Sequence, residues 1–248
     1  MAETNTGPIR VEPCAKRVRA YLGGHPVADT VASRLVWEHP YYPTYYIPVA
    51  DLRAKLEPTG VTREHPALGA GTEFDVAGDS GAAPAAAVRY LDSPELGDLV
   101  RLDFQAMDEW FEEDEPIYVH PRDPYSRVDI LASSRRIRVE LNGETLADSR
   151  SARILFETGL PPRYYLPLTD VRQDLLRPSP TSSQCPYKGT AEYRHVRLGE
   201  EEFRDLVWLY RTPLPESQKV AGLACFYNEK VDIYVDEVLQ PRPNTPFS

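Results

Sequence analysis

The clearest local pattern in the chain is an alternation of apolar and polar residues on both sides of an Asn-Gly pair. Residues 136–141 alternate, Asn142-Gly143 follows, and residues 144–148 continue the pattern. Both positions of a tight two-residue turn need a positive φ, which Asn and Gly adopt most readily, so this pattern predicts a β-hairpin. Gly23-Gly24 stands between similar segments and predicts a second hairpin.

The two predicted hairpins open two copies of one segment. Residues 17–56 and 136–175 match without a gap at an offset of 119, and fifteen of the 40 positions are identical. Unrelated sequences of average composition would match at roughly two or three positions. The shared residues include Gly24/Gly143, Asp29/Asp148, Arg34/Arg153, Glu38/Glu157, Tyr45-Tyr46/Tyr164-Tyr165 and Arg53/Arg172. A duplication provides an internal control, because packing requirements persist in both copies whereas a site needs to survive in only one.

The rest of the pattern predicts a mainly β protein with little helix. Further strands of the second copy are expected at residues 152–158, 164–167, 192–197, 205–210, 223–228 and 231–236. Thr169 or Asp170 is expected to cap a short helical turn that runs through Leu176, and residues 216–221 also have helical character. The Pro/Ser-rich residues 177–184 predict a loop, and the Gly/Ala-rich residues 78–87 predict a flexible one.

These patterns give five segments along the chain. We expect a flexible tail at 1–16, a first copy with a degraded motif at 17–115, a connecting segment at 116–134, a second copy with the motif intact at 135–240, and a tail at 241–248.

The connecting segment contains His120-Pro-Arg-Asp-Pro-Tyr125. Its two prolines restrict the backbone, so we expect an ordered clasp between the copies rather than a spacer. His120 and Arg122 would then lie at the edge of a ligand site in the second copy.

Composition limits the classes of function. The length of 248 residues fits two domains of about 100 residues each. A net charge of −10 argues against nucleic acid or an anionic membrane as the main partner, because both require clustered Lys and Arg. No apolar run approaches the roughly 18 residues of a membrane span, and residues 1–11 lack a signal-peptide core. Three cysteines without a CxxC pair favour the reducing cytoplasm and give no zinc site.

The motifs of the second copy resemble a bacterial and fungal family known as domain of unknown function 427. The matching motifs are Asn142-Gly143-Glu144-x-x-Ala147-Asp148-Ser149, Glu157-Thr-Gly-Leu-Pro161-x-Arg163-Tyr164-Tyr165-x-Pro167, Asp170-Val-Arg172, Cys185-Pro-Tyr-Lys-Gly189 and Phe226-Tyr227. The resemblance extends over nearly the whole chain, since many members carry two copies joined by a His-Pro-Arg-Asp-Pro-Tyr segment. It implies tandem Mss4-like, or β-tent, domains in which two sheets meet at an angle. Zinc-binding relatives of that shape use cysteine pairs, which this chain lacks.

The family is also filed among the nucleotidyltransferases, an activity that the residues disfavour. Such enzymes need a Gly-Gly or Gly-Ser turn followed closely by paired metal-binding carboxylates. Here Gly23-Gly24 precedes the carboxylates Glu73 and Asp75 by about 50 residues, and Arg194 aligns with Asp75 in the second copy.

The comparison of the copies marks Cys185-Pro-Tyr-Lys-Gly189 as a candidate site. The first copy reads His65-Pro-Ala-Leu-Gly69 at the same place, so Pro and Gly persist while Cys, Tyr and Lys do not. Lys188 can favour the thiolate of Cys185 and activate it as a nucleophile. Alternatively, Lys188 binds an anion while Cys185 only packs.

Other second-copy residues extend this site. Arg163 replaces Thr44 and adds a positive charge. Glu157 is either a general base or an ion-pair partner of Arg153 or Arg172, and its persistence as Glu38 favours a structural pair. The paired tyrosines of each copy alternate across a strand, so one of each pair is expected to face the core and the other a pocket.

We therefore expect a cytoplasmic protein that binds, and in an enzymatic version transforms, a small anionic molecule in the second copy. The catalytic candidates are Cys185 and Glu157. The ligand-binding candidates are Arg163, Tyr164, Tyr165, Tyr187, Lys188, His120 and Arg122. The motifs indicate no metal site and no particular cofactor. The alternative is a protein-interaction or structural module without catalysis, which would use an exposed, tyrosine-rich sheet.

Overall fold

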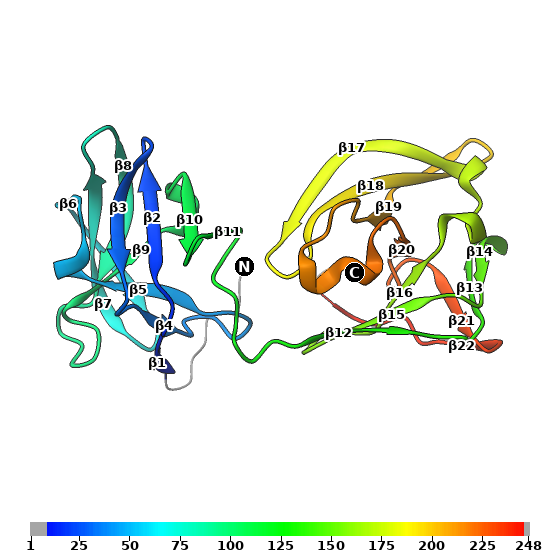
Figure 1. The fold of residues 1–248 in the computed structure, drawn as a ribbon, viewed down its shortest axis with the longest axis horizontal. Helices are drawn as coiled ribbons and strands as arrows, with labels where there is room; N and C mark the ends of the chain where they lie inside the picture. The colour runs from blue at the N-terminus through cyan, green and yellow to red at the C-terminus, as the bar shows by residue number, and fades with distance from the viewer. Residues whose placement is uncertain (1–8, 246–248) are drawn as a thin grey trace. The chain divides into compact units, whose positions relative to one another are not determined.

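The computed structural model describes residues 9–245 and divides the chain into two units, residues 1–123 and 124–248. Each unit combines a seven-stranded and a four-stranded sheet, and neighbouring strands run antiparallel (Figure 1). Helix within residues 9–245 is limited to short 3-10 segments, none of them long and apolar enough to cross a membrane. The prediction of two tandem, mainly β domains is confirmed.

The first copy has one large and one small sheet, and the strands of each are named from one edge to the other. The large sheet consists of β1 (Val11–Pro13), β4 (Arg34–Val36), β5 (Thr44–Pro48), β9 (Leu99–Leu102), β8 (Ala82–Arg89), β7 (Gly69–Ala77) and β6 (Lys55–His65). The small sheet consists of β11 (Glu115–Ile117), β10 (Glu109–Glu112), β2 (Val18–Leu22) and β3 (His25–Thr30). The 3-10 segments are η1 (Val49–Asp51) and η2 (Phe104–Ala106).

The second copy repeats this order strand for strand. Its large sheet consists of β12 (Val128–Ala132), β15 (Arg153–Glu157), β16 (Arg163–Leu166), β20 (Ala224–Phe226), β19 (Glu201–Leu209), β18 (Gly189–Leu198) and β17 (Leu176–Cys185). Its small sheet consists of β14 (Glu144–Ser149), β13 (Ile137–Leu141), β21 (Asp232–Val235) and β22 (Val238–Leu239). The 3-10 segments are η3 (Leu168–Asp170), η4 (Gln173–Leu175) and η5 (Pro215–Val220).

The two predicted hairpins lie at equivalent places. Gly23-Gly24 joins β2 to β3 and Asn142-Gly143 joins β13 to β14. All four residues have positive φ, between 52° for Asn142 and 81° for Gly143. The turn chemistry read from the sequence therefore accounts for both hairpins.

The offset between the copies changes from 119 to 120 after these opening strands. Leu56 pairs with Val76, and Leu176 pairs with Val196, so the second copy holds one extra residue in the region of η4. In this register Asp75 corresponds to His195. The ungapped alignment, which placed Arg194 there, is wrong beyond this point.

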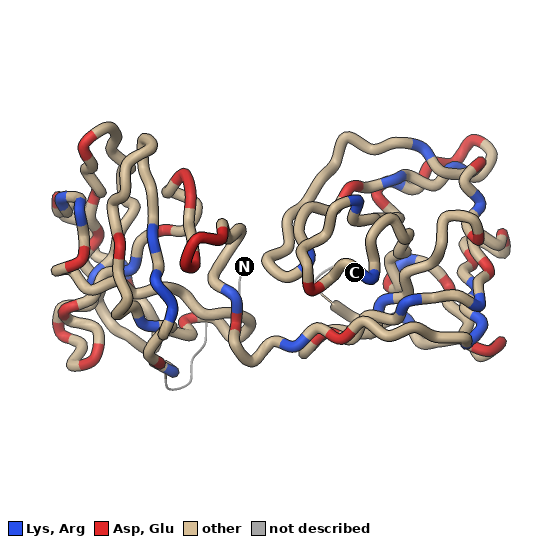
Figure 2. Tube along the Cα trace, in the orientation of Figure 1, with Lys and Arg blue, Asp and Glu red and all other residues tan. Residues whose placement is uncertain are grey.

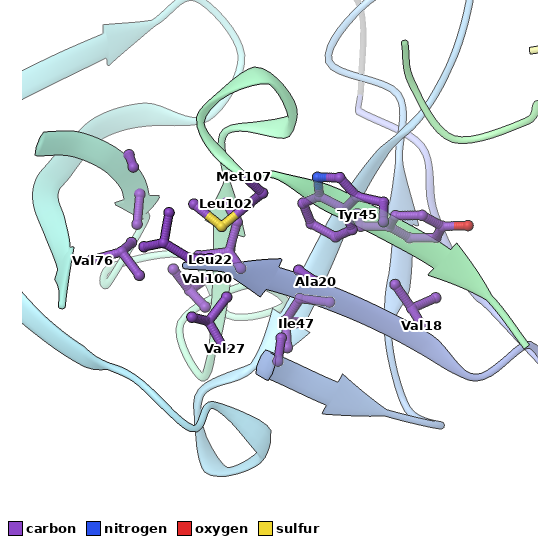
Figure 3. Close-up of a cluster of buried hydrophobic side chains, with 14 of the residues drawn as sticks. Val18, Ala20, Leu22, Val27, Tyr45, Ile47, Val76, Val100, Leu102 and Met107 are labelled. Atoms are coloured by element: carbon purple, nitrogen blue, oxygen red, sulfur yellow. The ribbon is translucent and has the colours of Figure 1, made fainter. Parts of the chain in front are cut away.

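Alternating side chains of the two sheets form the main core of each copy. In β2 and β13 the first, third and fifth residues are buried, as expected for strands with one face on the core. In the first copy, Val18 and Ala20 from the small sheet pack with Val100 and Leu102 from the large sheet (Figure 3).

A second apolar cluster covers the opposite face of each large sheet. Tyr45 belongs to the core between the sheets, whereas the adjacent Tyr46 belongs to this second cluster. Likewise Tyr164 packs against one cluster and Tyr165 is buried in the other. The two tyrosines of each pair therefore lie on opposite faces of the sheet, and Tyr45 also contributes to the lining of a cavity in the first unit.

Two segments predicted as loops form strands. Ala82–Arg89 is strand β8, in which Ala83, Ala86 and Ala87 are buried, because small side chains suit a crowded sheet interior. The Pro/Ser-rich residues 177–184 belong to β17, which pairs with β18 through a bulge between Pro178 and Ser182. Pairing along an edge strand tolerates proline, which local composition alone does not reveal.

Smaller differences concern the predicted helix and the segment ends. The capped turn through Leu176 is replaced by η3 and η4, and neither has a side-chain cap. Strand β1 lies within the predicted tail at 1–16, and the predicted connecting segment holds the end of β11 and all of β12. Residues 1–8 and 246–248 of the predicted tails lie outside the described residues. The helical segment expected near residues 216–221 is confirmed as η5.

Candidate functional site

Three predicted site residues meet at one end of the large sheet of the second copy. Cys185 ends β17 and pairs with Gly189, whose φ of 94° permits the tight connection to β18. This connection carries Lys188, whose Nζ donates a hydrogen bond to Glu157 Oε2 at 2.6 Å. The Cys185 thiol is near enough to the same ammonium group to help raise the pKa of Lys188. We call Cys185, Lys188 and Glu157 the thiol–lysine–glutamate cluster.

The cluster is largely enclosed. The side chains of Lys188 and Glu157 are only 11% and 10% exposed. Burial opposes the charge on Lys188, but the neighbouring Cys185 and Glu157 outweigh it and raise the pKa of the ammonium group. Lys188 therefore stays protonated and does not serve as a general base.

Two buried tyrosines stand beside this cluster. Burial, with Cys185 and Glu157 nearby, raises the pKa of Tyr210 above its ordinary value. Burial likewise raises the pKa of Tyr165, whose hydroxyl oxygen accepts a hydrogen bond from Trp208 Nε1 at 3.1 Å. Both phenols are therefore neutral, so the only strong charges of this group are the compensating ones of Lys188 and Glu157.

The first copy keeps the carboxylate but takes its cation from another strand. Arg101 Nη1 on β9 donates to Glu38 Oε2 at 2.9 Å, and the Tyr46 hydroxyl donates to the other oxygen. In the second copy the position of Arg101 is occupied by Cys225, which pairs with Tyr165 as Arg101 pairs with Tyr46. A buried carboxylate requires a partner, and the two copies supply it differently.

The arginines that the sequence suggested as partners of these glutamates lie elsewhere. Arg53 pairs with Asp29 at 2.8 Å, and Arg172 pairs with Asp174 at 2.7 Å. The expected pairing of Glu157 with Arg153 or Arg172 is therefore corrected to Lys188. The error arose because the glutamates persist in both copies while their cations do not.

Arg163 is buried in a second ion pair. Its two terminal nitrogens donate to the two carboxylate oxygens of Glu229, both at 2.7 Å. The side chains are 8% and 0% exposed, and the guanidinium lies over the ring of Trp208 at 5.5 Å. Glu229 was not predicted from the sequence as the partner of Arg163. The available indication was indirect: the first copy has Thr44 in place of Arg163, so a carboxylate partner is needed in the second copy only.

The other predicted ligand-binding residues are dispersed. Tyr187 is partly exposed, and its backbone carbonyl accepts a hydrogen bond from Ser217 Oγ at 3.0 Å. His120 stacks on Tyr42 of the first unit, with ring centroids 3.9 Å apart. Arg122 is partly exposed in the first unit.

An open cavity of about 630 Å³ lies in the second unit, and its lining contains no residue of the two buried ion pairs. Its walls carry the cations Arg150, Arg153 and Lys219 beside the hydroxyl-bearing residues Ser133, Ser134 and Ser151. The lining, which falls entirely within the described part of the chain, includes no Asp or Glu and none of Arg163, Tyr187 and Lys188. We call this cavity the basic pocket.

The described residues contain no cluster of His, Cys, Asp and Glu arranged to hold a metal ion. In the first copy, Glu73 pairs with Arg63, and Asp75 accepts a hydrogen bond from the backbone N–H of Ala85 at 2.7 Å. These two carboxylates therefore have structural partners within their own sheet.

The repeated sheet pairs and their buried ion pairs define a tandem β protein with a different set of charges in each copy. Residues 10–113 and 129–237 each match the family described as "Domain of unknown function (DUF427)". The chain belongs to this family. No curated protein matches it in sequence.

Proposed function

We propose that the second copy binds a small anionic molecule in the basic pocket. The observation that carries this proposal is the lining itself, in which Arg150, Arg153 and Lys219 converge without a carboxylate. The chain as a whole has a net charge of −10, and acidic residues are distributed along both units (Figure 2). A wall of three cations is therefore not a consequence of general composition.

The cations predicted from sequence do not support this role. Arg163 and Lys188 are each paired with a buried carboxylate, Glu229 and Glu157. An anion that bound to Arg163 or Lys188 would have to displace the buried carboxylate from its cation. The free-energy cost would be that of breaking a buried ion pair. In the basic pocket, Arg153 Nη1 donates to the carbonyl oxygen of Ala152 at 3.5 Å, and the carboxylates that interact with Arg150, Asp148 and Asp236, are exposed rather than buried.

The comparison of the copies supports the basic pocket. Arg153 corresponds to Arg34, but Arg150 corresponds to Val31 in the ungapped alignment. Lys219 comes from the segment between Tyr210 and Leu223, which is longer than its first-copy counterpart between Tyr90 and Leu99. Two of the three cations are thus particular to the second copy, as expected for a site that survives in one copy only.

The polar groups of the pocket suit an anion with several oxygen atoms. Arg150 and Arg153 offer guanidinium groups that bind carboxylate or phosphate oxygens in pairs. Lys219 Nζ already donates to the carbonyl of Ile130 at 3.1 Å, which fixes its ammonium group and leaves further protons for a ligand. The seryl hydroxyls add donors that carry no charge.

Isothermal titration of the full chain with phosphate, pyrophosphate and citrate tests the proposal. At least one anion is expected to bind, and Arg150→Gln, Arg153→Gln and Lys219→Gln are each expected to weaken binding about tenfold, since a hydrogen bond to a charged group contributes about 1.5–3 kcal/mol. Arg204→Gln is the matched control, because its side chain is 84% exposed and lies outside the pocket. Equal affinity of the wild-type protein and the triple variant for every anion would overturn the proposal.

A further inference from the structure

A second cavity, in the first unit, has a different chemical character. It has a volume of about 310 Å³, at the lower end of the range for small-molecule sites. The buried side chains of Tyr45 and Trp110 contribute to its lining, together with the partly exposed rings of Tyr42, Phe104 and His120. We call it the aromatic pocket.

The rings of the aromatic pocket are arranged in two stacks. Tyr42 lies between His39 and His120, with centroid separations of 4.6 Å and 3.9 Å and interplanar angles of 25° and 10°. Phe104 lies parallel to Trp110 at 5.0 Å with an interplanar angle of 5°. Of these rings, His120 and Phe104 end their stacks and also line the pocket. Planar ring faces of this kind favour a planar ligand.

The polar groups of the aromatic pocket favour a ligand that donates hydrogen bonds. His120 Nδ1 lies 2.7 Å from the carbonyl oxygen of Pro121, which can only accept, so Nδ1 carries the proton. In the neutral imidazole Nε2 is then an acceptor. Asp103 adds a carboxylate, while Arg101, the one cation of the lining, is paired with Glu38. The pocket therefore offers acceptors and no uncommitted positive charge among its described lining residues.

The aromatic walls are particular to the first copy. Strand pairing places Trp110 opposite Ala20 and Ile233 opposite Val139, so Trp110 and Ile233 are equivalent. Phe104 and Asn228 each lie two residues after the equivalent strand ends, Leu102 and Phe226. The ungapped alignment matches Tyr42 with Pro161. The second copy thus lacks three of the rings, although it retains the strands on which, or next to which, they lie.

Packing alone does not require these rings, because the second copy forms the same sheets without them. Residues that occur in one copy only, and that packing does not require, mark a candidate site in that copy. The first copy lacks the cysteine and the lysine of the thiol–lysine–glutamate cluster, and it carries the aromatic pocket instead.

We propose that the aromatic pocket binds a planar heteroaromatic ring bearing N–H donors. The ring either stacks on Phe104 and donates its N–H groups to Asp103 and to His120 Nε2, or stacks on His120 and donates to Asp103. This site is independent of the basic pocket, because the two have no lining residue in common and lie in different units.

Saturation-transfer NMR on the full chain tests the proposal, with adenine, cytosine and nicotinamide as probes and pyridine as a neutral planar ring without N–H donors. At least one of the three probes is expected to bind at millimolar concentration and more tightly than pyridine. Phe104→Asn introduces the residue of the second copy and removes one stacking face. Phe104→Asn and His120→Ala are each expected to weaken binding about tenfold to hundredfold, as for the loss of one stacked ring.

Phe111→Asn is the matched control, because Phe111 lies on neighbouring β10 outside the pocket lining and packs on Tyr21. It is expected to bind the probes as the wild-type protein does. Absence of binding by all three probes, binding of pyridine as tightly as the best of them, or equal binding by the Phe104→Asn and wild-type proteins would overturn the proposal. If Phe104→Asn fails to fold, His120→Ala, whose residue is partly exposed, gives the same comparison. The Arg153→Gln variant should leave probe binding unchanged, so this result and the anion titration stand or fall separately.

Discussion

Lys188 neutralises Glu157 from the β17–β18 connection, whereas the equivalent carboxylate of the first copy, Glu38, is neutralised by Arg101 from β9. The glutamate is retained while its cation comes from two unrelated positions. This exchange shows that the carboxylate at the end of the strand is a fixed part of the fold. Lys188 reaches this carboxylate from the connection that follows Cys185.

The buried pair gives the first prediction. Lys188→Met and Glu157→Gln are each expected to lower the free energy of unfolding by about 3–5 kcal/mol, because each leaves one buried polar group without its partner. The double variant should lose less than the sum of the two, since the second change removes the group that the first leaves unpaired. Urea unfolding of the four proteins measures the coupling.

The exposed pair Arg172–Asp174 is the control for this comparison, with side chains 50% and 61% exposed. Arg172→Met is expected to cost less than about 1 kcal/mol. Additive losses for Lys188 and Glu157, or a loss no larger than that of Arg172→Met, would contradict the assignment of a coupled buried pair.

The ion pair of Arg163 with Glu229 gives a pH-dependent prediction. Burial opposes ionisation of Glu229, but hydrogen bonds from Arg163 and Thr245 outweigh it and hold the pKa of the carboxyl below its ordinary value of 4.5. A carboxyl with a depressed folded pKa contributes stability that is present above its unfolded pKa and lost as the pH falls through the folded pKa. The stability difference between the wild-type protein and Glu229→Gln should therefore be constant near neutral pH and shrink below pH 4.5.

Denaturant unfolding of both proteins between neutral and acidic pH checks this behaviour. Asp174→Asn provides a matched comparison, because Asp174 is an exposed carboxyl whose pKa is lowered by Arg172. A Glu229→Gln difference that grows on acidification would have the wrong sign for this pair.

Cys185 should be the reactive thiol of the native protein. Cys14 and Cys225 are buried, and burial raises the pKa of the Cys225 thiol, whereas Cys185 is partly exposed beside the Lys188 ammonium group. Iodoacetamide is therefore expected to modify one thiol under native conditions, and Cys185→Ser should abolish that reaction. Replacement by serine should change the free energy of unfolding by no more than about 1.5 kcal/mol.

Two further variants separate an activated thiol from an inert one. Lys188→Met removes the cation that favours the thiolate and is expected to slow alkylation. Glu157→Gln removes the carboxylate that competes for the same ammonium group and is expected to accelerate it. Equal alkylation rates in both variants, measured on proteins shown to be folded, would contradict activation of the Cys185 thiol by Lys188.

The sequence predicted the features that depend on local geometry or on repetition. Asn142 and Gly143 predict a tight turn because few residues adopt positive φ. The duplication is detected by comparing residues 17–56 directly with residues 136–175. Cys185 and Lys188 were predicted to lie together because they belong to one short connection, whereas the contact of Lys188 with Glu157 was not predicted, since Arg153 or Arg172 was expected as the partner of that carboxylate. Glu157 joined the candidate set as a shared carboxylate at a strand end.

The failures have a common physical origin in pairing between distant strands. Nothing near Arg163 in sequence indicates that Glu229 closes its ion pair, 66 residues further along the chain. The cations of the basic pocket also come from separate segments, so no motif joins Arg150 to Lys219. The alanines of β8 were mistaken for a flexible loop, because their role is defined by the crowded neighbours β7 and β9.

The bulge of β17 has a consequence for the behaviour of the protein in concentrated solution. An unpaired strand at the border of a sheet is a template on which another chain can add its own strand. In β17 and in its counterpart β6, the ladder is interrupted after Pro178 and after Pro58. Proline has no amide proton to offer to an incoming strand, and the interruption bends the border away from a straight edge. Duplication has therefore doubled the number of large sheets while preserving, in each, a border that resists polymerisation.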